Sequence, residues 1–502
     1  MLEVHPAQEA FLTAYREGRN QVLWTELVAD MDTAVSLMLK LTSTERDSFI
    51  LESVTGGEIR GRYSMIGCKP DLIWRCRGDK AELNRAAQHD REKGFRRESL
   101  SSLDSLRALI KECHIDLPEG LPPMAAGLWG YLGYDMIRLV EHLPDENPDP
   151  LDLPDAMMLR PSIIAIVDNI KDQVTLCAPV WYHEGTSAKD AYDGAQNRLE
   201  DALTLIDRAP AYTPVTPAPA EAVRAVSPVS NTTHAEYLEM VARAKEYIQA
   251  GDIFQVVPSQ RWSMELEVPP FALYRALRRL NPSPYMFYFD MGGFQIVGAS
   301  PEILVRVRGD QVTIRPIAGT RPRGADETED AALEAELLAD QKELAEHLML
   351  LDLGRNDVGR VAKIGSVDPN EQFNIERYSH VMHIVSNVDG VLREDQDAVS
   401  ALLAGLPAGT VSGAPKIRAM EIIDELEKEK RGVYAGGVGY FSSGGDMDTC
   451  IALRTGVVKG GKLYVQAGGG VVYDSDPQAE FDETVAKSRA LLAAASMARS
   501  FN

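Results

Sequence analysis

Residues 285–299 read YMFYFDMGGFQIVGA, two apolar runs separated by a short break that contains two glycines. Aromatic and β-branched residues favour strands, and a glycine-rich break between two such runs is typical of a β-hairpin. With Met291–Gly293 as the turn, we expect Tyr285 to face Ala299 across the ladder. Most neighbouring runs in this half of the chain also have hairpin spacing. The sequence therefore predicts an α+β fold of antiparallel and mixed sheets with helices outside, not a doubly wound parallel sheet.

The remaining strands are predicted from apolar and β-branched runs, and the helices from periodic apolar residues. The predicted strands cover residues 49–54, 127–132, 162–167, 254–257, 303–307, 311–316, 436–441, 449–457 and 463–467. The predicted helices cover residues 101–112, 234–250, 328–351 and 477–497. Thr233 and Glu236 have the spacing of a capping box at the start of the second of these helices, and Gly251 is expected to end it.

A proline-rich segment divides the chain. Residues 208–231 read RAPAYTPVTPAPAEAVRAVSPVSN, with five prolines and no helical or strand period. Proline lacks the amide hydrogen that helices and sheets need, so we expect an extended surface linker. The sequence predicts an N-terminal domain over residues 1–207 and a second domain over residues 232–502.

The chain is strongly acidic. Its 502 residues include 52 lysines and arginines against 75 aspartates and glutamates, a formal charge of −23. Nucleic acids and anionic membranes attract basic surfaces, so neither is an expected partner. An anionic substrate would need cations gathered at one place. The five cysteines include no CxxC pair, and no apolar stretch is long enough to span a membrane. No signal peptide is recognisable at the N-terminus, so we expect a cytoplasmic protein.

Two acidic pairs stand out on predicted helices. Glu343 and Glu346 are three residues apart, and so are Glu480 and Glu483. This spacing puts each pair on one helical face. Two such pairs have the oxygen ligands that a magnesium ion prefers. Two solvated helix faces are the other interpretation, and the spacing alone favours it.

Glycines next to cations form a second candidate cluster. The candidate anion-binding residues are Gly319, Thr320, Arg454, Gly468, Gly469, Gly470 and Lys487. Arg454 is expected in a strand, and Lys487 one helical turn after Glu483. Backbone amides and cationic side chains together bind carboxylates. Ordinary turns with surface charges are an equally good interpretation of each motif.

Two further residues are candidates for proton transfer. Glu302 lies between apolar strand residues, where burial would raise the pKa of its carboxyl and suit it to act as a general acid. The alternative is an acidic turn residue before a strand. His383 lies in a strand-like apolar run, where a histidine is more often a core residue than a catalyst.

Taken together, these segments resemble the chorismate-utilising enzymes and, within them, the large subunits of anthranilate synthases. The strings that carry the resemblance in the second part are GDIFQVVPSQ (251–260), NPSPYMFYF (281–289), GASPE (298–302), RPIAGTRPRG (315–324), KELAEHLMLLDLGRNDVGRV (342–361), RYSHVMHIVS (377–386), GTVSGAPKIRAME (409–421), RGVYAGGVGYF (431–441), DTCIALRT (448–455) and QAGGGVVYDSDPQAEFDET (466–484). The first part adds ILES (50–53), GRYSMIG (61–67) and GLWGYLGYD (127–135). One departure is Gly469, where the family usually has alanine.

The resemblance implies the fold of that family, a β-sandwich with helices outside and two lobes. It also implies a role for each candidate. Magnesium would be bound directly by Glu346 and Glu483, and through water by Glu343 and Glu480. The carboxylates of chorismate would be held by Gly319, Thr320, Tyr434, Arg454, Gly468, Gly469, Gly470 and Lys487. Glu302 would protonate the departing ring hydroxyl, His383 would lie against the ring, and Thr410 would hydrogen-bond the substrate.

The implied reaction adds ammonia to chorismate, releases the 4-hydroxyl group, and then eliminates pyruvate to give anthranilate. The sequence contains no recognisable glutaminase domain, so ammonia would come from a separate amidotransferase subunit in a hetero-oligomer. Family members that add water carry a lysine at the position of Gln255, and many para-directing aminodeoxychorismate synthases carry one at the position of Ala318. Aminodeoxychorismate or isochorismate synthesis, or a non-catalytic tryptophan-binding regulator, remain the alternatives.

The resemblance also implies feedback inhibition by L-tryptophan. The effector would contact Ser53 together with Pro284, Tyr285 and Met286. Pro284, Tyr285 and Met286 belong to the hairpin segment that leads to Glu302, so an effector there would lie close to the catalytic acid. A packed strand and a small core contact are the alternative interpretation.

Overall fold

The computed structural model describes residues 3–42, 46–53, 61–209, 228–378 and 381–501. Most of the predicted linker, residues 210–227, lies outside the described residues, as does residue 54 at the end of the first predicted strand. The helices are α1 (Gln8–Arg16), α2 (Ala34–Thr42), α3 (Ser102–Glu112), α4 (Ala188–Ile206), α5 (His234–Ala250), α6 (Pro270–Leu280), α7 (Glu327–Ala339), α8 (Gln341–Gly359), α9 (Ala398–Gly405), α10 (Lys416–Leu426) and α11 (Pro477–Met497).

The strands are β1 (Gln21–Val28), β2 (Ser48–Glu52), β3 (Tyr63–Arg77), β4 (Lys80–Asn84), β5 (Arg96–Arg97), β6 (Gly127–Leu132), β7 (Ala156–Asp168), β8 (Gln173–Val180), β9 (Val229–Ser230), β10 (Gln255–Val256), β11 (Ser259–Glu265), β12 (Tyr285–Asp290), β13 (Gln295–Ser300), β14 (Ile303–Arg308), β15 (Gln311–Ile314), β16 (Ile317–Pro322), β17 (Asp368–Arg377), β18 (Val381–Val391), β19 (Gly413–Ala414), β20 (Gly437–Ser442), β21 (Met447–Ile451), β22 (Thr455–Lys459) and β23 (Lys462–Gly468).

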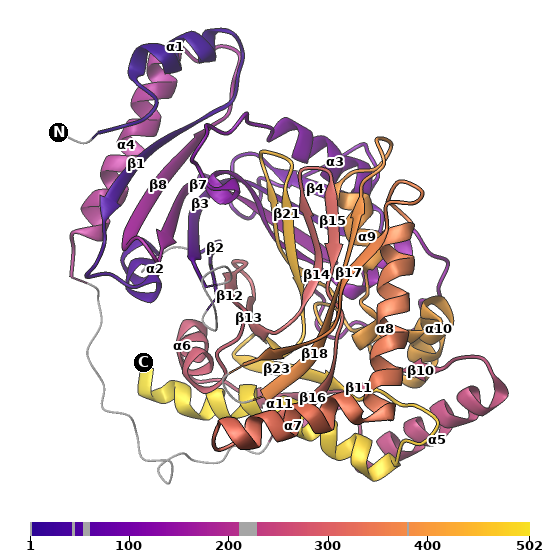
Figure 1. Ribbon diagram of the computed structural model, residues 1–502. Coiled ribbons are helices and arrows are strands. Elements are labelled where there is room, and N and C mark those ends of the chain that lie inside the picture. Colours follow the sequence, from indigo (N-terminus) through magenta and orange to yellow (C-terminus); the bar gives the residue numbers. More distant parts are fainter. Residues whose placement is uncertain (1–2, 43–45, 54–60, 210–227, 379–380, 502) are drawn as a thin grey trace.

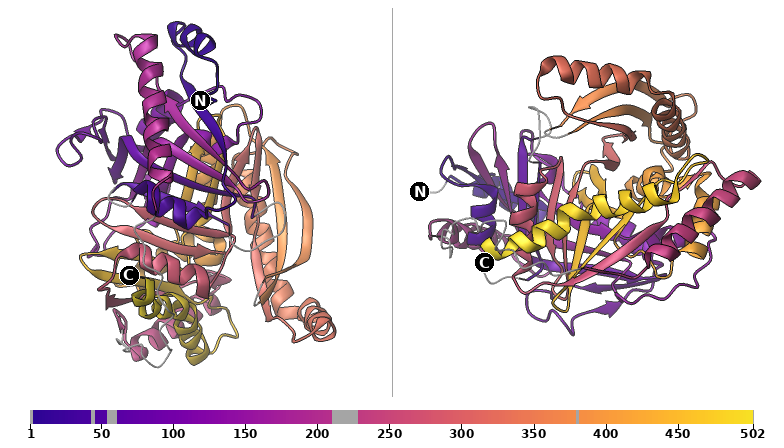
Figure 2. Two further views of the ribbon diagram at one scale, coloured as in Figure 1. Left: turned by 90° about the vertical axis from the view of Figure 1, so that its left-hand side faces the viewer. Right: turned by 90° about the horizontal axis from the view of Figure 1, so that it is seen from below.

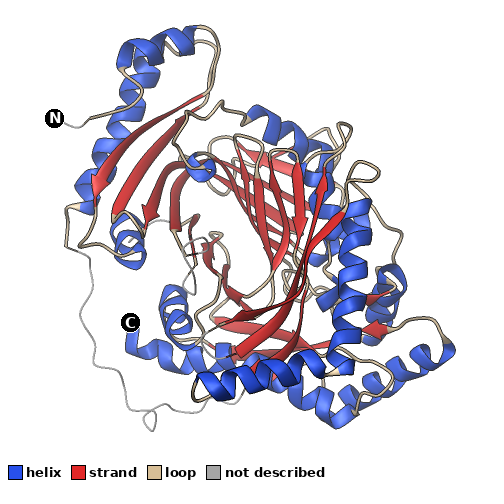
Figure 3. Cartoon of the chain, viewed as in Figure 1, coloured by secondary structure: helices blue, strands red, loops and turns tan. Residues whose placement is uncertain are grey.

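The strands occupy the interior and the helices lie around them, which confirms the α+β prediction (Figures 1 and 3). Neighbouring strands pair antiparallel, and two of the pairs join the two parts of the chain. β2 pairs with β12, and β6 pairs with β20. The N-terminal residues therefore complete sheets that the second part begins, and the two parts share hydrophobic cores as well.

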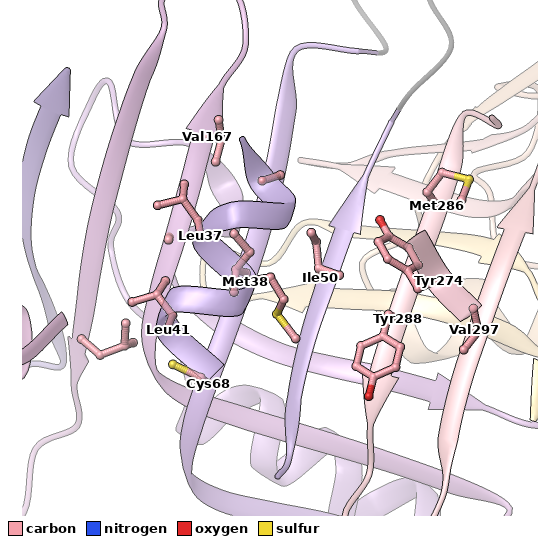
Figure 4. Close-up of a cluster of buried hydrophobic side chains, with 14 of the residues drawn as sticks. Leu37, Met38, Leu41, Ile50, Cys68, Val167, Tyr274, Met286, Tyr288 and Val297 are labelled. Atoms are coloured by element: carbon pink, nitrogen blue, oxygen red, sulfur yellow. The ribbon is translucent and has the colours of Figure 1, made fainter. Parts of the chain in front are cut away.

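One of these shared cores lies where α2 covers β2 and β3. Figure 4 shows Leu37 and Met38 of α2 near Ile50 of β2, with Met286 and Tyr288 of β12 on the adjacent strand. All five side chains are at most 5% exposed. Burial of large apolar side chains stabilises a fold by roughly 1.5–3 kcal/mol each. This cluster therefore ties β2 of the first part to β12 of the second.

The hairpin at residues 285–300 forms, but its register differs by one residue from the prediction. Tyr285 pairs with Ser300 rather than with Ala299. The Met291 amide donates to the Phe294 carbonyl at 2.9 Å, so Met291 belongs to the ladder and the turn is the two glycines alone. Gly292 has φ +78°, a conformation that a two-residue hairpin turn requires and that glycine adopts readily.

The single helix predicted over residues 328–351 is wrong, because two helices occupy this region. α7 ends at Ala339, and Asp340 leaves the helical conformation with ψ 105°. The Asp340 side chain accepts hydrogen bonds from the amides of Lys342 and Glu343, so it caps α8. α8 then continues to Gly359, well beyond the predicted end.

The strand predicted over residues 449–457 is also two strands. β21 pairs with β14 and β20, whereas β22 pairs with β13 and β23, so the chain changes neighbours between them. Arg454 lies in this connection with φ +49°, and not in a strand as expected. Similarly, the strand predicted over residues 311–316 breaks before Pro316, and residues 317–322 form β16.

Several local predictions are confirmed. Thr233 and Glu236 form the capping box of α5, and Gly251 ends that helix in the left-handed conformation. α11 spans Pro477–Met497, as expected. All five cysteines are free and buried. Burial raises the pKa of the Cys113 thiol to about 11.

A buried ion pair joins α8 to α10. Lys416 Nζ lies 2.7 Å from Asp357 Oδ2, and the two side chains are 6% and 5% exposed. Lys416 also donates to the Ala404 carbonyl at the end of α9. The pair therefore fixes α8, which carries Glu343 and Glu346, against two other helices.

Replacing Lys416 by methionine would leave Asp357 buried without a counter-charge. We expect the melting temperature of Lys416→Met to fall clearly, because breaking one side of a buried pair costs about 3–5 kcal/mol. The double variant Lys416→Met/Asp357→Leu buries no charge and should recover most of the loss. A double variant no more stable than the single one would contradict this account.

Candidate active site

A cavity of about 440 Å³ collects nearly all the residues singled out from the sequence. The predicted residues that line it are Glu302, Gly319, Thr320, Glu343, Glu346, His383, Thr410, Tyr434, Arg454, Gly468, Gly470, Glu480, Glu483 and Lys487. Gly469 does not line the cavity. Its amide donates to the Pro258 carbonyl, and a side chain added there would meet the Glu480 carboxylate at 2.8 Å.

Glu302 lies between β13 and β14 and is 6% exposed. Burial raises the pKa of its carboxyl to about 8, an effect reduced by a hydrogen bond from Thr410. The Thr410 hydroxyl lies 3.2 Å from each carboxylate oxygen. Positive charge on Arg454 and Lys487 also lowers this pKa, though not enough to cancel the effect of burial. Near neutral pH, the carboxyl therefore holds a proton that it can donate.

His383 faces the same cavity from β18. Its Nδ1 lies 2.9 Å from Thr320 Oγ1 and 3.3 Å from the Gly319 carbonyl oxygen. Burial and the nearby Arg454 guanidinium lower the pKa of the imidazole to about 4, so the ring is neutral at physiological pH. Gly319 has φ +72°, and this left-handed residue produces the irregularity in β16 that brings its carbonyl to His383.

The two acidic pairs approach the cavity from α8 and α11. In Figure 2, the orange segment that contains α7 and α8 stands apart from the yellow α11. Burial and the negative charges of Glu343 and Glu483 raise the pKa of the Glu346 carboxyl. Glu480 accepts a hydrogen bond from Ser475 through Oε1, while its buried Oε2 has no partner among the described residues.

These carboxylates have the chemistry of a site for a hard divalent cation, because they supply only oxygen donors and repel one another. In the described part of the chain, however, no three carboxylate, histidine or cysteine side chains lie close enough together to hold an ion. The Gln255 amide lies beside the cluster, with Nε2 3.4 Å from Glu346 Oε1. Its Oε1 is buried and has no partner among the described residues.

The predicted anion-binding groups surround the rest of the cavity. Lys487 Nζ contacts Glu483 Oε1 at 2.7 Å and the Gly468 carbonyl at 3.0 Å. The Gly469 amide donates to the Pro258 carbonyl, so this predicted glycine amide already has a protein partner. Burial lowers the pKa of the Arg454 guanidinium, which nevertheless remains charged.

A second and larger cavity, of about 650 Å³, lies at the pairing of β2 with β12. All four predicted effector residues, Ser53, Pro284, Tyr285 and Met286, line it. Two buried polar atoms in its wall have no partner among the described residues, Ser53 Oγ and Asp448 Oδ1. Sequence reasoning missed Asp448, although it begins the quoted DTCIALRT string.

The opposite wall of the larger cavity is polar and was also missed. It includes Arg306, Arg308, Arg315, Asn370, Glu371, Glu376, Asn387 and Asp389. No sequence pattern pointed to this wall, because its residues come from separate strands and a strand connection that only the sheet brings together. The described helices include none with the length and apolar character needed to cross a membrane.

Comparison with known proteins supports the family resemblance seen in the sequence. The profile of the chorismate binding enzyme family matches residues 60–493. Anthranilate synthase component 1 of Cereibacter sphaeroides is 64% identical over 487 residues, covering 97% of both chains. The Pseudomonas putida protein of that name is 48% identical over 506 residues, covering 98% of both chains.

Solved structures agree. Anthranilate synthase component I from Streptococcus pneumoniae TIGR4 has a TM-score of 0.75 at 37% identity, covering 87% of this chain and 93% of that one. The isochorismate synthase MenF from Escherichia coli has a TM-score of 0.68 at 20% identity, which indicates a shared fold only. The chain therefore belongs to the chorismate-binding enzymes and, within them, to the family of anthranilate synthase component 1.

Proposed function

We propose that this chain converts chorismate and ammonia to anthranilate, pyruvate and water, the first committed step of tryptophan biosynthesis. The smaller cavity carries the proposal. There, a protonated buried acid, a neutral histidine and two cations surround a space large enough for one small substrate. The relatives named as component 1 of anthranilate synthase support the choice of reaction.

Proton transfer follows from the state of Glu302. Ammonia carries its own lone pair and needs no base to attack the ring, whereas the departing 4-hydroxyl needs a proton to leave as water. Glu302 is protonated near neutral pH and supplies that proton, held in place by Thr410. His383 is neutral and lies against the ring, where it assists the later loss of pyruvate and aromatisation. A positioned acid contributes on the order of 10²- to 10⁴-fold in rate.

Binding of the substrate dianion explains why cations are concentrated in an acidic chain. Arg454 and Lys487 provide charge for the two carboxylates, and Tyr434, Thr320 and the glycine turns provide hydrogen bonds. The Gly470 amide makes no hydrogen bond within the described part of the chain, so it is the glycine amide best placed to bind substrate. In this structure the Lys487 ammonium contacts Glu483, and with substrate bound it would contact both Glu483 and a substrate carboxylate.

The oxygen donors of the two acidic pairs suit magnesium as the cofactor. Glu346 and Glu483 would hold the ion directly, with Glu343 and Glu480 supporting it through water. When bound, magnesium supplies positive charge that fixes and orients a substrate carboxylate. The raised pKa of the Glu346 carboxyl and the unpartnered Glu480 oxygen support a cation here.

Ammonia would come from a glutamine amidotransferase subunit, the second component that the relatives' name implies. All five thiols of this chain are buried, so none is placed to attack glutamine. Gln255 stands where a water-activating base would be needed, which favours amination over isochorismate synthesis.

Buried free thiols also suit a reducing compartment, and a cytoplasmic location remains our prediction.

The larger cavity would bind L-tryptophan as a feedback inhibitor. Leu51, Met65 and Met286 provide an apolar surface for an indole ring. The unpartnered Asp448 and Ser53 oxygens suit the ammonium group and a second polar contact of an amino acid. Tryptophan and chorismate would then weaken each other's binding by the same factor, since linkage is reciprocal.

The function is tested by fluorescence of the product. The purified chain with chorismate, magnesium chloride and ammonium should produce anthranilate, at a rate that increases with free ammonia. Glutamine should replace ammonium only after an amidotransferase subunit is added. Failure to use ammonium would exclude the proposed reaction, and glutamine use by the lone chain would exclude the proposed division of labour.

Loss of the acid is expected to stop the 4-hydroxyl from leaving. Glu302→Gln should lower kcat by about 10²- to 10⁴-fold while chorismate binding is largely retained. In the wild type, Glu302 is protonated below its raised pKa and loses the proton above it. At constant free ammonia, kcat should therefore fall as pH rises through about 8. A wild-type rate in Glu302→Gln would remove this residue from the mechanism.

Removal of either direct magnesium ligand is expected to abolish activity. Glu346→Gln and Glu483→Gln should each lower the rate by at least about 100-fold, since even supporting groups around a metal are worth 10- to 100-fold. Asp352→Asn on α8 and Asp482→Asn on α11 are matched controls, because both carboxylates are exposed and lie outside the cavity. Full activity of the wild type in excess chelator would refute the metal assignment.

A further inference from the structure

The two cavities share a wall. On β18, His383 lines the smaller cavity, while Asn387 and Asp389 on the same face of the strand line the larger one. Residues two apart along a strand lie on one face, so a single row of side chains passes from one cavity to the other. β17 pairs with β18 along this row, and Glu376 stands directly opposite His383. Glu376 nevertheless lines the larger cavity, so this pair marks the boundary.

A chain of contacts crosses that boundary. In the larger cavity, Arg315 Nη2 donates to Glu376 Oε1 at 2.6 Å. The other carboxylate oxygen, Oε2, accepts from the Tyr378 hydroxyl at 2.7 Å. The Tyr378 ring then meets the His383 ring edge-on, with centroids 5.6 Å apart. The mechanism proposed above uses none of Arg315, Glu376 and Tyr378.

We infer that Glu376 is a positioning residue that holds Tyr378 against His383. Through its bond to Arg315, Glu376 also couples ligand binding in the larger cavity to the position of His383. The inference rests on the proposed function, in which His383 serves catalysis and an amino acid occupies the larger cavity. Its new content is the identity of the connecting residues.

The charges around Arg315 explain how occupancy would be transmitted. Its guanidinium is 11% exposed and serves two carboxylates, Glu376 at 2.6 Å and Glu371 at 3.7 Å. Charge-assisted bonds to a guanidinium are strong and directional, so a ligand carboxylate that reaches Arg315 competes for the same donors. Glu376 would then loosen, its bond to Tyr378 would change, and the ring would no longer fix His383.

Two variants test this, and a third is a matched control. Glu376→Gln removes the charge with little change of shape, and Tyr378→Phe removes only the hydroxyl. Glu371→Gln is the control, because Glu371 lies on the same strand, lines the same cavity and faces the same arginine. The Tyr378 hydroxyl donates to the Glu376 carboxylate at 2.7 Å, so Glu376 is the carboxylate that the inference tests.

The readouts are kcat and KM with chorismate and ammonium, and tryptophan binding by calorimetry with and without chorismate. Glu376→Gln and Tyr378→Phe should lower kcat about tenfold with KM for chorismate within about twofold, because a small misplacement of a catalytic group costs rate. Tryptophan alone should bind Tyr378→Phe as it binds the wild type, and Glu376→Gln at least as tightly, because the variant amide competes less strongly for Arg315. Its antagonism with chorismate should weaken by about tenfold. Glu371→Gln should behave as the wild type does.

The opposite results overturn the inference. Wild-type kcat and wild-type antagonism in both test variants would do so, and so would equal losses in Glu371→Gln. If the wild type makes anthranilate but does not bind tryptophan, the transmitting role falls with the effector assignment, while the kcat comparison still decides the positioning role. If the wild type makes no anthranilate, the proposed function itself is refuted. Ser53→Phe, which places an aromatic ring in the larger cavity, should instead abolish tryptophan binding.

Discussion

The backbone pairing of β2 with β12 is the constraint on which the rest of the structure depends. It joins segments more than 200 residues apart and so makes one sheet from the two parts of the chain. The core of α2 against Ile50 and Tyr288 forms only because these strands are neighbours. The larger cavity opens at the end of the same pairing, where Ser53 meets the segment that begins at Pro284. This cavity is therefore built from both parts of the chain and is lost if either is displaced.

The sheet also sets the distance between the two cavities. Glu302 of the smaller cavity directly precedes β14, and Arg306 on β14 lines the larger cavity. β18 likewise contributes His383 to the smaller cavity and Asn387 to the larger one. In the smaller cavity, burial away from water raises the pKa of the Glu302 carboxyl and lowers that of the His383 imidazole.

Sequence patterns predicted the fold class and the membership of the smaller cavity well, because both depend on local strings that stay together in the fold. The α5 cap and α11 are of this kind. The patterns failed where a single residue decides whether a helix or strand continues or ends. Asp340 ends α7 by capping α8, and Arg454 adopts positive φ so that the chain can change sheet neighbours. The polar wall of the larger cavity was beyond reach, since its members, such as Arg315 and Asn387, meet only through non-local pairing.

The five buried thiols have a practical consequence for studying this molecule. A thiol reacts through its thiolate, and burial raises the pKa of Cys76 to about 12. Cys68 lies in β3 next to β2, Cys177 lies in β8 two strands further along the sheet, and Cys450 lines the larger cavity. A labelling reagent would therefore react at each cysteine only when its own surroundings open. The order in which the cysteines become modified would record which sheets separate first, without any introduced probe.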